Sequence, residues 1–284
     1  MGFNVQKIGL AIAFSPTAGA LLAEACRLAK LFDSQLILMH VGNRNAEEDK
    51  KLNELIQTVN LLGVTYKIIW RIGNPATEIL HVCQEENIDL LVAGALKKEN
   101  LLQNYIGTVA RKIMRKSGCS VLMIQNPTKN PSPLRNVVVA AEGSPHVELA
   151  VETACQISRL ENAQWIHIVR ELKLLGLTLA VNEQCNEEEY AESKQGMVRE
   201  EVEQVEKMLA RIPHEGQKIN IKMLSGKSGF ELAIFTEKKK AELLIVGAPA
   251  QRLSLVDRLF PHDLEYIFAN LPCNLLVVKP RKKT

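Results

Sequence analysis

The residues most suggestive of chemistry lie in the stretch LLVAGALKKENLLQNYIGT, Leu90 to Thr108. Gly94 follows an apolar run, and Gly107 with Thr108 opens a stretch of helical periodicity. Backbone N–H groups of a glycine-containing turn and of a helix start, together with a hydroxyl, are a common way of binding phosphate. The spacing leaves two interpretations open, a helix cap and turn without a ligand or a phosphate-binding loop.

An internal repeat indicates which elements position this loop. KIGLAIAFSPTAGALLAEACRLAKLF matches NVVVAAEGSPHVELAVETACQISRLE at an offset of 129 residues. RIGNPATEILHVCQEENIDLLVAG matches LSGKSGFELAIFTEKKKAELLIVG at an offset of 153, and SGCSVLMI matches LPCNLLVV at 154. The second copy therefore has an insertion between His167 and Leu224, placed at about residues 170–190. It precedes a charged stretch predicted as a long helix, Glu187–Arg211.

A proline-rich segment separates the two copies. NPTKNPSP, residues 126–133, contains three prolines, and proline cannot continue a helix or a central strand. We therefore expect two domains, residues 1–127 and 134–284, with a linker at 128–133.

Short apolar runs alternate with longer stretches of helical periodicity in each copy. In the first copy the runs are Ile8–Ala13, Leu36–Val41, Thr65–Arg71, Leu90–Gly94 and Ser120–Ile124. Strands without polar alternation are typical of a parallel sheet that is covered by helices on both faces. The predicted fold class is α/β, with two tandem doubly wound domains. Each has a five-stranded parallel sheet of order 3-2-1-4-5.

Capping residues predict where helices begin and end. Asn74 before Pro75 marks one start. Gly107 marks another, and Gly118 is expected to end that helix. Near the C-terminus, FPHDLEYIF places His262, Asp263 and Glu265 close together. Metal binding or acid–base chemistry is one interpretation of this group. The favoured one makes Asp263 a helix N-cap, with Tyr266, Ile267 and Phe268 entering the core.

Composition and motifs restrict the function classes. Hydrophobic content is 46% and charged content 24%, as in ordinary globular proteins. The formal net charge of +3 is too small to indicate nucleic-acid binding, and no apolar run is long enough to cross a bilayer. We therefore expect a cytoplasmic protein. The six cysteines form no CxxC pair and are interpreted as buried hydrophobes in a reduced compartment. No nucleophile elbow, HExxH or Walker loop is present, so an enzyme is not predicted.

A ligand in such a sheet binds at the carboxyl ends of the strands, where the winding reverses between the first and fourth strands. The residues expected at that point are Ala13, Phe14, Ser15 and Gly94 in the first copy, and Glu142, Gly143, Ser144 and Gly247 in the second. The opening loop follows Gly94, so it lies where a ligand is expected.

The two copies resemble universal stress protein domains in tandem, over nearly the whole chain. The resemblance rests on AIAFSPT and VAAEGSP, MHV and IHI, LLVAG and LLIVG, and GCSVLMI and PCNLLVV, in this order. It implies a Rossmann- or flavodoxin-like, adenine-nucleotide alpha hydrolase-like fold and a role in stress adaptation. It also implies that the domains pair through their last strands, here Ser120–Ile124 and Leu275–Val278. Two chains could still associate as a homodimer.

Nucleotide-binding members of that family carry a signature: glycine, two residues, glycine, nine residues, glycine, then Ser or Thr. An aspartate at the end of the first strand usually accompanies it. In the first copy Lys97 replaces the second glycine and Ala13 stands at the aspartate position. In the second copy Ala250 replaces that glycine, and Phe260 and Pro261 replace the final pair. The site residues that the resemblance implies are Ala13, Phe14, Ser15, Val41, Gly94, Lys97, Gly107, Thr108 and Val109, with a degenerate set Glu142, Gly143, Ser144 and Gly247.

These departures predict weak binding of ATP or AMP in the first domain and an improbable site in the second. A lost charged hydrogen bond costs about 1.5–3 kcal/mol, and a side chain forced to positive φ at Lys97 would cost about 1–2 kcal/mol. No metal is expected apart from Mg²⁺ accompanying ATP. A ligand-free protein that binds an unknown protein partner is the alternative, and slow ATP hydrolysis is a less favoured one.

Overall fold

The structure is a computed structural model that describes residues 2–59, 61–97, 104–141, 146–172, 187–225, 228–248 and 262–281. The first half of the chain (residues 1–127) contributes the strands β1 (Lys7–Ile12), β2 (Gln35–Val41), β3 (Tyr66–Arg71), β4 (Leu90–Gly94) and β7 (Ser120–Ile124). Its helices are α1 (Ala18–Phe32), α2 (Ala46–Gln57), α3 (Pro75–Glu85) and α4 (Thr108–Lys116).

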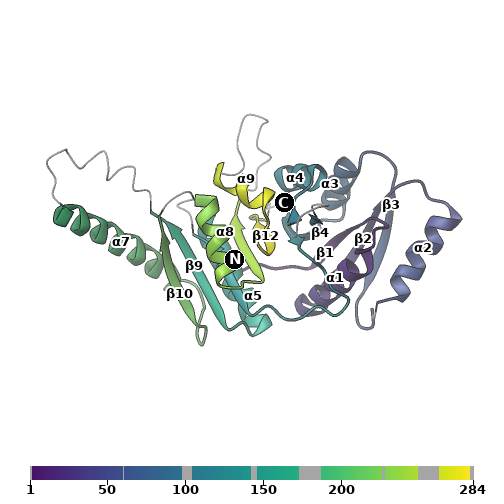
Figure 1. Cartoon of the computed structure of the whole chain (residues 1–284). Helices are drawn as coiled ribbons and strands as arrows, with labels where there is room; N and C mark the ends of the chain where they lie inside the picture. Colours follow the sequence, from purple (N-terminus) through teal and green to yellow (C-terminus); the bar gives the residue numbers. More distant parts are fainter. Residues whose placement is uncertain are drawn as a thin grey trace.

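The second half (residues 134–284) repeats this arrangement. Its strands are β8 (Asn136–Ala140), β9 (Trp165–Glu171), β10 (Ile219–Leu224), β11 (Leu243–Gly247) and β12 (Asn274–Val278). Its helices are α5 (Val147–Glu161), α7 (Glu187–Leu209), α8 (Ser228–Lys238) and α9 (His262–Ala269). The long helix α7 takes the place that α2 has in the first half, and the two helices lie at opposite ends of the molecule (Figure 1).

One ten-stranded sheet runs through both halves, in the order β10-β9-β8-β11-β12-β7-β4-β1-β2-β3. Each half has five parallel strands in the predicted order 3-2-1-4-5. The halves join where β7 and β12 pair antiparallel, with Leu276 opposite Leu122. The predicted pairing of the last strands within one chain is therefore confirmed.

Two apolar cores lie on the two faces of this sheet. One contains buried residues from α1, α2, α5 and α7, and the other from α3, α4, α8 and α9. Alternate residues of a strand enter opposite cores, as Leu36 and Ile37 of β2 do. Both cores include residues of both halves, so burial of apolar surface holds the halves together.

Local signals explain several helix boundaries. The Asn74 side chain accepts a hydrogen bond from the amide of Thr77 at 3.3 Å, with Pro75 in the first turn, as predicted. Helices α1 and α5 each end at a residue with a left-handed backbone conformation. These residues, Asp33 and Asn162, occupy equivalent positions of the repeat. Asn and Asp tolerate this conformation better than most residues, so these positions favour them after a helix.

Three sequence predictions were wrong in detail. Helix α4 ends at Lys116, and Ser117 in an extended conformation ends it before Gly118. Helix α9 begins at His262, one residue before the predicted cap Asp263. Tyr266 is 39% exposed, whereas Ile267 and Phe268 enter the core. A short hairpin of β5 (Leu96–Lys97) and β6 (Asn104–Tyr105) was not predicted, because two-residue strands carry no periodic signal.

Reciprocal hydrogen bonds reinforce the contact between β7 and β12. The amide of Gln125 donates to Asn274 Oδ1 at 2.8 Å, and the amide of Lys279 donates to Ser120 Oγ at 3.1 Å. Side chains extend this pattern: Gln125 Nε2 donates to the carbonyl of Leu271, and Lys279 Nζ to that of Ser117, both at 2.7 Å. Each half thus satisfies carbonyls at the end of a helix in the other half.

The shared cores predict that the two halves unfold together. Trp70 and Trp165 report on one half each, so Trp70→Phe and Trp165→Phe variants separate the two signals. Leu276 is 1% exposed beside the joining strand, and Leu276→Ala should lower the free energy of unfolding by about 2–5 kcal/mol. Urea titrations should show the same lowered midpoint for both tryptophans.

A shift confined to Trp165 would contradict this cooperativity. Leu62→Ala is the control, because Leu62 is 82% exposed. It should change the free energy of unfolding by about 0.5 kcal/mol or less.

Candidate functional site

The carboxyl ends of β1, β2 and β4 meet at one edge of the sheet, where the site was predicted. Strand β1 lies between the other two, with Ile12 opposite His40 and Leu10 opposite Val92. Ala13 directly follows β1, and Gly94 ends β4. Since neighbouring strands are about 4.8 Å apart, this edge brings the residues after β1 close to Val41 and Gly94.

Aromatic rings form part of this edge, which sequence analysis missed. The rings of Phe14 and His40 have centroids 4.7 Å apart, and those of His40 and Trp70 are 4.6 Å apart. His40 Nδ1 lies 3.1 Å from the carbonyl oxygen of Ile12. Ala13, Phe14 and Ser15 are exposed. The end of β1 therefore presents an accessible surface beside a buried imidazole. The position of a histidine near the strand end was the only signal of this contact in the sequence.

Helix α4 begins at the predicted position, with Gly107 as its N-cap residue. Within the described part of the chain, no group accepts a hydrogen bond from the amides of Thr108, Val109 or Ala110. Thr108 and Val109 are exposed. Unpaired amides at a helix start carry partial positive charge, so this end of α4 can bind an anion.

Contacts with the second half hold the start of α4 in place. The amide of Ile106 donates to the carbonyl of Phe268 at 2.9 Å, and Arg111 Nε donates to the carbonyl of Ile106 at 2.8 Å. Arg111 also pairs with Glu265 of α9 at 2.5 Å. Arg111 is therefore engaged in structural contacts.

Gly94 of the predicted loop has a packing role, whereas Gly107 lies next to Leu96, which is 51% exposed and can move. A Cβ atom at Gly94 would lie 2.8 Å from Leu21 Cδ1 of α1, and one at Gly107 would lie 2.6 Å from Leu96 Cδ1. Lys97, in the place of the second signature glycine, is in β5 and pairs with Asn104. Its backbone is extended, so the expected strain of a left-handed conformation does not arise there.

The comparisons with known proteins agree with this architecture. The family model described as "Universal stress protein family" matches residues 42–125 and 133–279, which is most of the chain. The chain belongs to the universal stress protein family.

Individual universal stress proteins match in part. MJ0577 of Methanocaldococcus jannaschii is 29% identical over 84 residues, which are 29% of this chain and 52% of that protein. The match thus spans about half of that relative. YxiE of Bacillus subtilis is 25% identical over 146 residues, covering 42% of this chain and 99% of that protein.

Solved structures match over nearly the whole length. PA1789 of Pseudomonas aeruginosa PAO1, described as functionally unknown, has a TM-score of 0.73 at 19% identity, covering 98% of this chain and 94% of that one. A universal stress protein from Archaeoglobus fulgidus has a TM-score of 0.66 at 16% identity, covering 97% and 98%. At these identities the likeness shows the fold, which is that of a tandem universal stress protein.

The second half of this universal stress protein is described only in part at the equivalent edge. Gly247 ends β11, and a Cβ atom there would lie 2.7 Å from the carbonyl oxygen of His146. Because that atom belongs to the backbone, glycine is required at this position. Glu142, Gly143, Ser144 and residues 249–261 lie outside the described residues.

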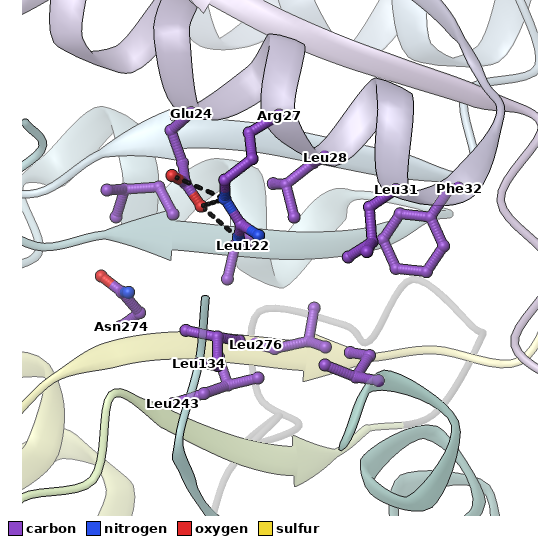
Figure 2. A pocket seen from close by; sticks show the side chains of 12 residues that line it. Glu24, Arg27, Leu28, Leu31, Phe32, Leu122, Leu134, Leu243, Asn274 and Leu276 are labelled. Carbon is purple, nitrogen blue, oxygen red and sulfur yellow. Dashed lines mark hydrogen bonds and ion pairs between the residues drawn. The ribbon is translucent and has the colours of Figure 1, made fainter. Parts of the chain in front are cut away.

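A small cavity lies at the seam between the halves, away from the predicted site (Figure 2). Leu28 and Phe32 of α1 line it from one side and Leu276 from the other. Arg27 bridges the seam, donating to Glu161 Oε1 at 2.6 Å and to Glu24 Oε1 at 2.8 Å. The cavity volume of ≈ 20 Å³ is far below the roughly 300 Å³ of a small-ligand pocket. It is a packing gap beside a buried ion pair.

Among the described residues, no group of three or more His, Cys, Asp or Glu side chains is arranged to hold a metal ion. None of the helices in the same ranges is both long and apolar enough to cross a bilayer.

The packing role of Gly94 can be tested directly. Gly94→Ala should lower the free energy of unfolding by about 1–3 kcal/mol, since the new methyl group collides with Leu21. In a Leu21→Ala background the same change should cost about 0.5 kcal/mol or less, because the colliding atoms are gone. Urea unfolding of the four proteins gives the coupling energy.

Gly118→Ala provides the control, because nothing lies within 4 Å of a Cβ atom there. It should leave the free energy of unfolding unchanged or slightly raised. Equal costs of Gly94→Ala in both backgrounds would mean that Leu21 is not the reason for this glycine.

Proposed function

We propose that this chain is a cytoplasmic stress-response binding module that binds an adenine nucleotide, ATP or AMP, weakly in its first half. The observation that carries this proposal is the start of α4, where the amides of Thr108, Val109 and Ala110 have no acceptor among the described residues. This helix start follows β4, whose end adjoins β1 at the point where the winding of the sheet reverses. That is where doubly wound sheets bind ligands.

Each part of the nucleotide has a proposed place. The phosphates would accept hydrogen bonds from the first amides of α4 and from the Thr108 hydroxyl. The backbone of Val41, at the end of β2, would contact the adenine, next to Phe14 and Ser15. A Mg²⁺ ion accompanying ATP would take its ligands from phosphates and water.

The affinity should be low because Ala13 offers no carboxylate. In the family signature an aspartate at this position contacts the adenine–ribose end of ATP. Loss of one charged hydrogen bond costs about 1.5–3 kcal/mol, or roughly 10- to 150-fold in affinity. Micromolar or weaker binding is therefore expected, and the second half is expected to bind no nucleotide.

The first experiment asks whether the purified protein carries a nucleotide. The protein is denatured, and the supernatant is chromatographed for ATP, ADP and AMP. Thermal unfolding is measured in parallel with millimolar ATP and Mg²⁺. Released nucleotide, or a raised midpoint with ATP, is the expected result.

A proline substitution tests the proposed phosphate contact. Thr108 is the first residue of α4, where proline fits a helix and removes only the amide N–H and the hydroxyl. Thr108→Pro should weaken ATP binding about tenfold or more, and Thr108→Ala, which keeps the amide, should weaken it less. Isothermal titration calorimetry measures the dissociation constants.

Val147→Pro is the matched control, because Val147 is the first residue of α5, in the half that is expected to bind no nucleotide. It should leave ATP binding unchanged. Binding that Thr108→Pro does not alter would place the nucleotide elsewhere. Absence of both released nucleotide and a thermal shift would contradict the proposal and favour a protein-binding role. Phe230, Ile234 and Tyr266, which are 41%, 43% and 39% exposed on α8 and α9, would then be the surface to test.

A further inference from the structure

Two cysteines that are 36 positions apart in the sequence meet in the first half. Cys83 lies on α3 and Cys119 directly precedes β7; both belong to the same buried apolar core, and their side chains interact electrostatically. Both residues are buried, at 7% and 8% exposure. Sequence analysis treated them as separate buried hydrophobes, but the fold makes them a dithiol.

Polar groups surround Cys119 in particular. The Ser117 hydroxyl lies 3.0 Å from Cys119 Sγ. Lys279, from the end of the second half, is 5% exposed, and its Nζ donates to the carbonyls of Met114 and Ser117 at 2.7 Å each. A cation from the other half is therefore buried beside the thiol pair.

These neighbouring groups favour the thiolate form of Cys119. The interaction with Cys83 lowers the pKa of Cys119 against the opposing effect of burial, and Ser117 and the Lys279 charge lower it further. The pKa of Cys83 is raised by the same interaction and by burial. Burial lowers the pKa of Lys279 to about 8, and the charge of Cys119 acts in the opposite direction. One thiol is thus suited to act as nucleophile and the other to remain protonated.

The second half has a cysteine at the position equivalent to Cys119, but it lacks the partner thiol and the cation. The repeat places Cys273 opposite Cys119, Thr236 opposite Cys83 and Gln125 opposite Lys279. Cys273 is also buried, at 5% exposure, and burial raises its pKa well above the usual range. Thr236 donates to the carbonyl of Leu232 at 2.7 Å. The two halves therefore share one buried cysteine but differ in the partner thiol and in the cation.

We propose that Cys83 and Cys119 form a redox pair that a small hydroperoxide oxidises reversibly to a disulfide, with the Lys279 ammonium of the second half beside the reacting thiol. Burial of both side chains excludes protein disulfides and other large oxidants. A small hydroperoxide is the class of oxidant that fits such a site.

The proposed chemistry proceeds in two balanced steps. The Cys119 thiolate attacks one peroxide oxygen, so that an S–O bond forms, the O–O bond breaks, and the leaving oxygen takes up a proton as water or an alcohol. The Cys83 sulfur then attacks the Cys119 sulfenic acid, forming the S–S bond and releasing water. The two sulfurs lose two electrons in total, and the peroxide gains them. A dithiol reductant reverses the reaction by exchange.

The first test uses the full chain treated with hydrogen peroxide. After denaturation and alkylation, two fewer of the six cysteines should be alkylated, and peptide mass spectrometry should find Cys83 linked to Cys119. Dithiothreitol should restore both thiols. Cys83→Thr, which introduces the residue found at the equivalent position 236, should stop at a Cys119 sulfenic acid that dimedone traps.

Substitutions at the cation test the role of the second half. Lys279→Gln, which copies position 125, should slow the loss of free Cys119 roughly tenfold, because less thiolate is present. Cys273→Ser is the matched control and should leave both the rate and the product unchanged. The reverse transfer, Thr236→Cys with Gln125→Lys, should create a second disulfide, between positions 236 and 273.

Thermal unfolding of each reduced variant establishes that it is folded. Oxidation of Cys119 at the same rate as Cys273 would overturn the proposal, and so would a disulfide that joins other positions. If the folded Lys279→Gln variant loses free Cys119 at an unchanged rate, Lys279 plays no part in the proposed reaction.

Discussion

The antiparallel contact between β7 and β12 is the interaction on which the rest of the structure depends. Three residues of each strand pair there, and both apolar cores continue across the contact. A five-stranded sheet that ended at β7 would expose the hydrogen-bonding groups and apolar side chains of that strand. The same contact brings α9 against the start of α4 and carries Lys279 to Ser117. Both the nucleotide site and the redox pair proposed in the first half therefore depend on the presence of the second.

Fusion of the two copies removes a constraint that a symmetric dimer would impose. In a pair of identical domains, each residue near the twofold axis faces its own copy. Here Arg111 faces Glu265, its equivalent in the repeat, so the pair is attractive where two identical domains would oppose like charges. The same freedom puts a cation at position 279 and an uncharged amide at the equivalent Gln125. Divergence across the seam thus makes the two halves complementary.

Sequence analysis succeeded where the signal was local or repeated. Strand positions followed from apolar runs, the parallel doubly wound sheet from the alternation with helices, and the joining strands from the family resemblance. It failed where a contact depends on packing between distant segments. Nothing near Cys83 indicates that it meets Cys119, and the repeat hid the pair because its second copy has Thr236. Lys279 directly follows β12, and its burial depends on carbonyls at the end of α4.

The opposite strand directions of the two halves have a consequence for the shape of any assembly. All strands of the first half run against those of the second, so their carboxyl edges lie on opposite sides of the sheet. A molecule docked at one edge leaves the other sterically free. The common sheet therefore holds the two carboxyl edges at a constant separation and facing in opposite directions.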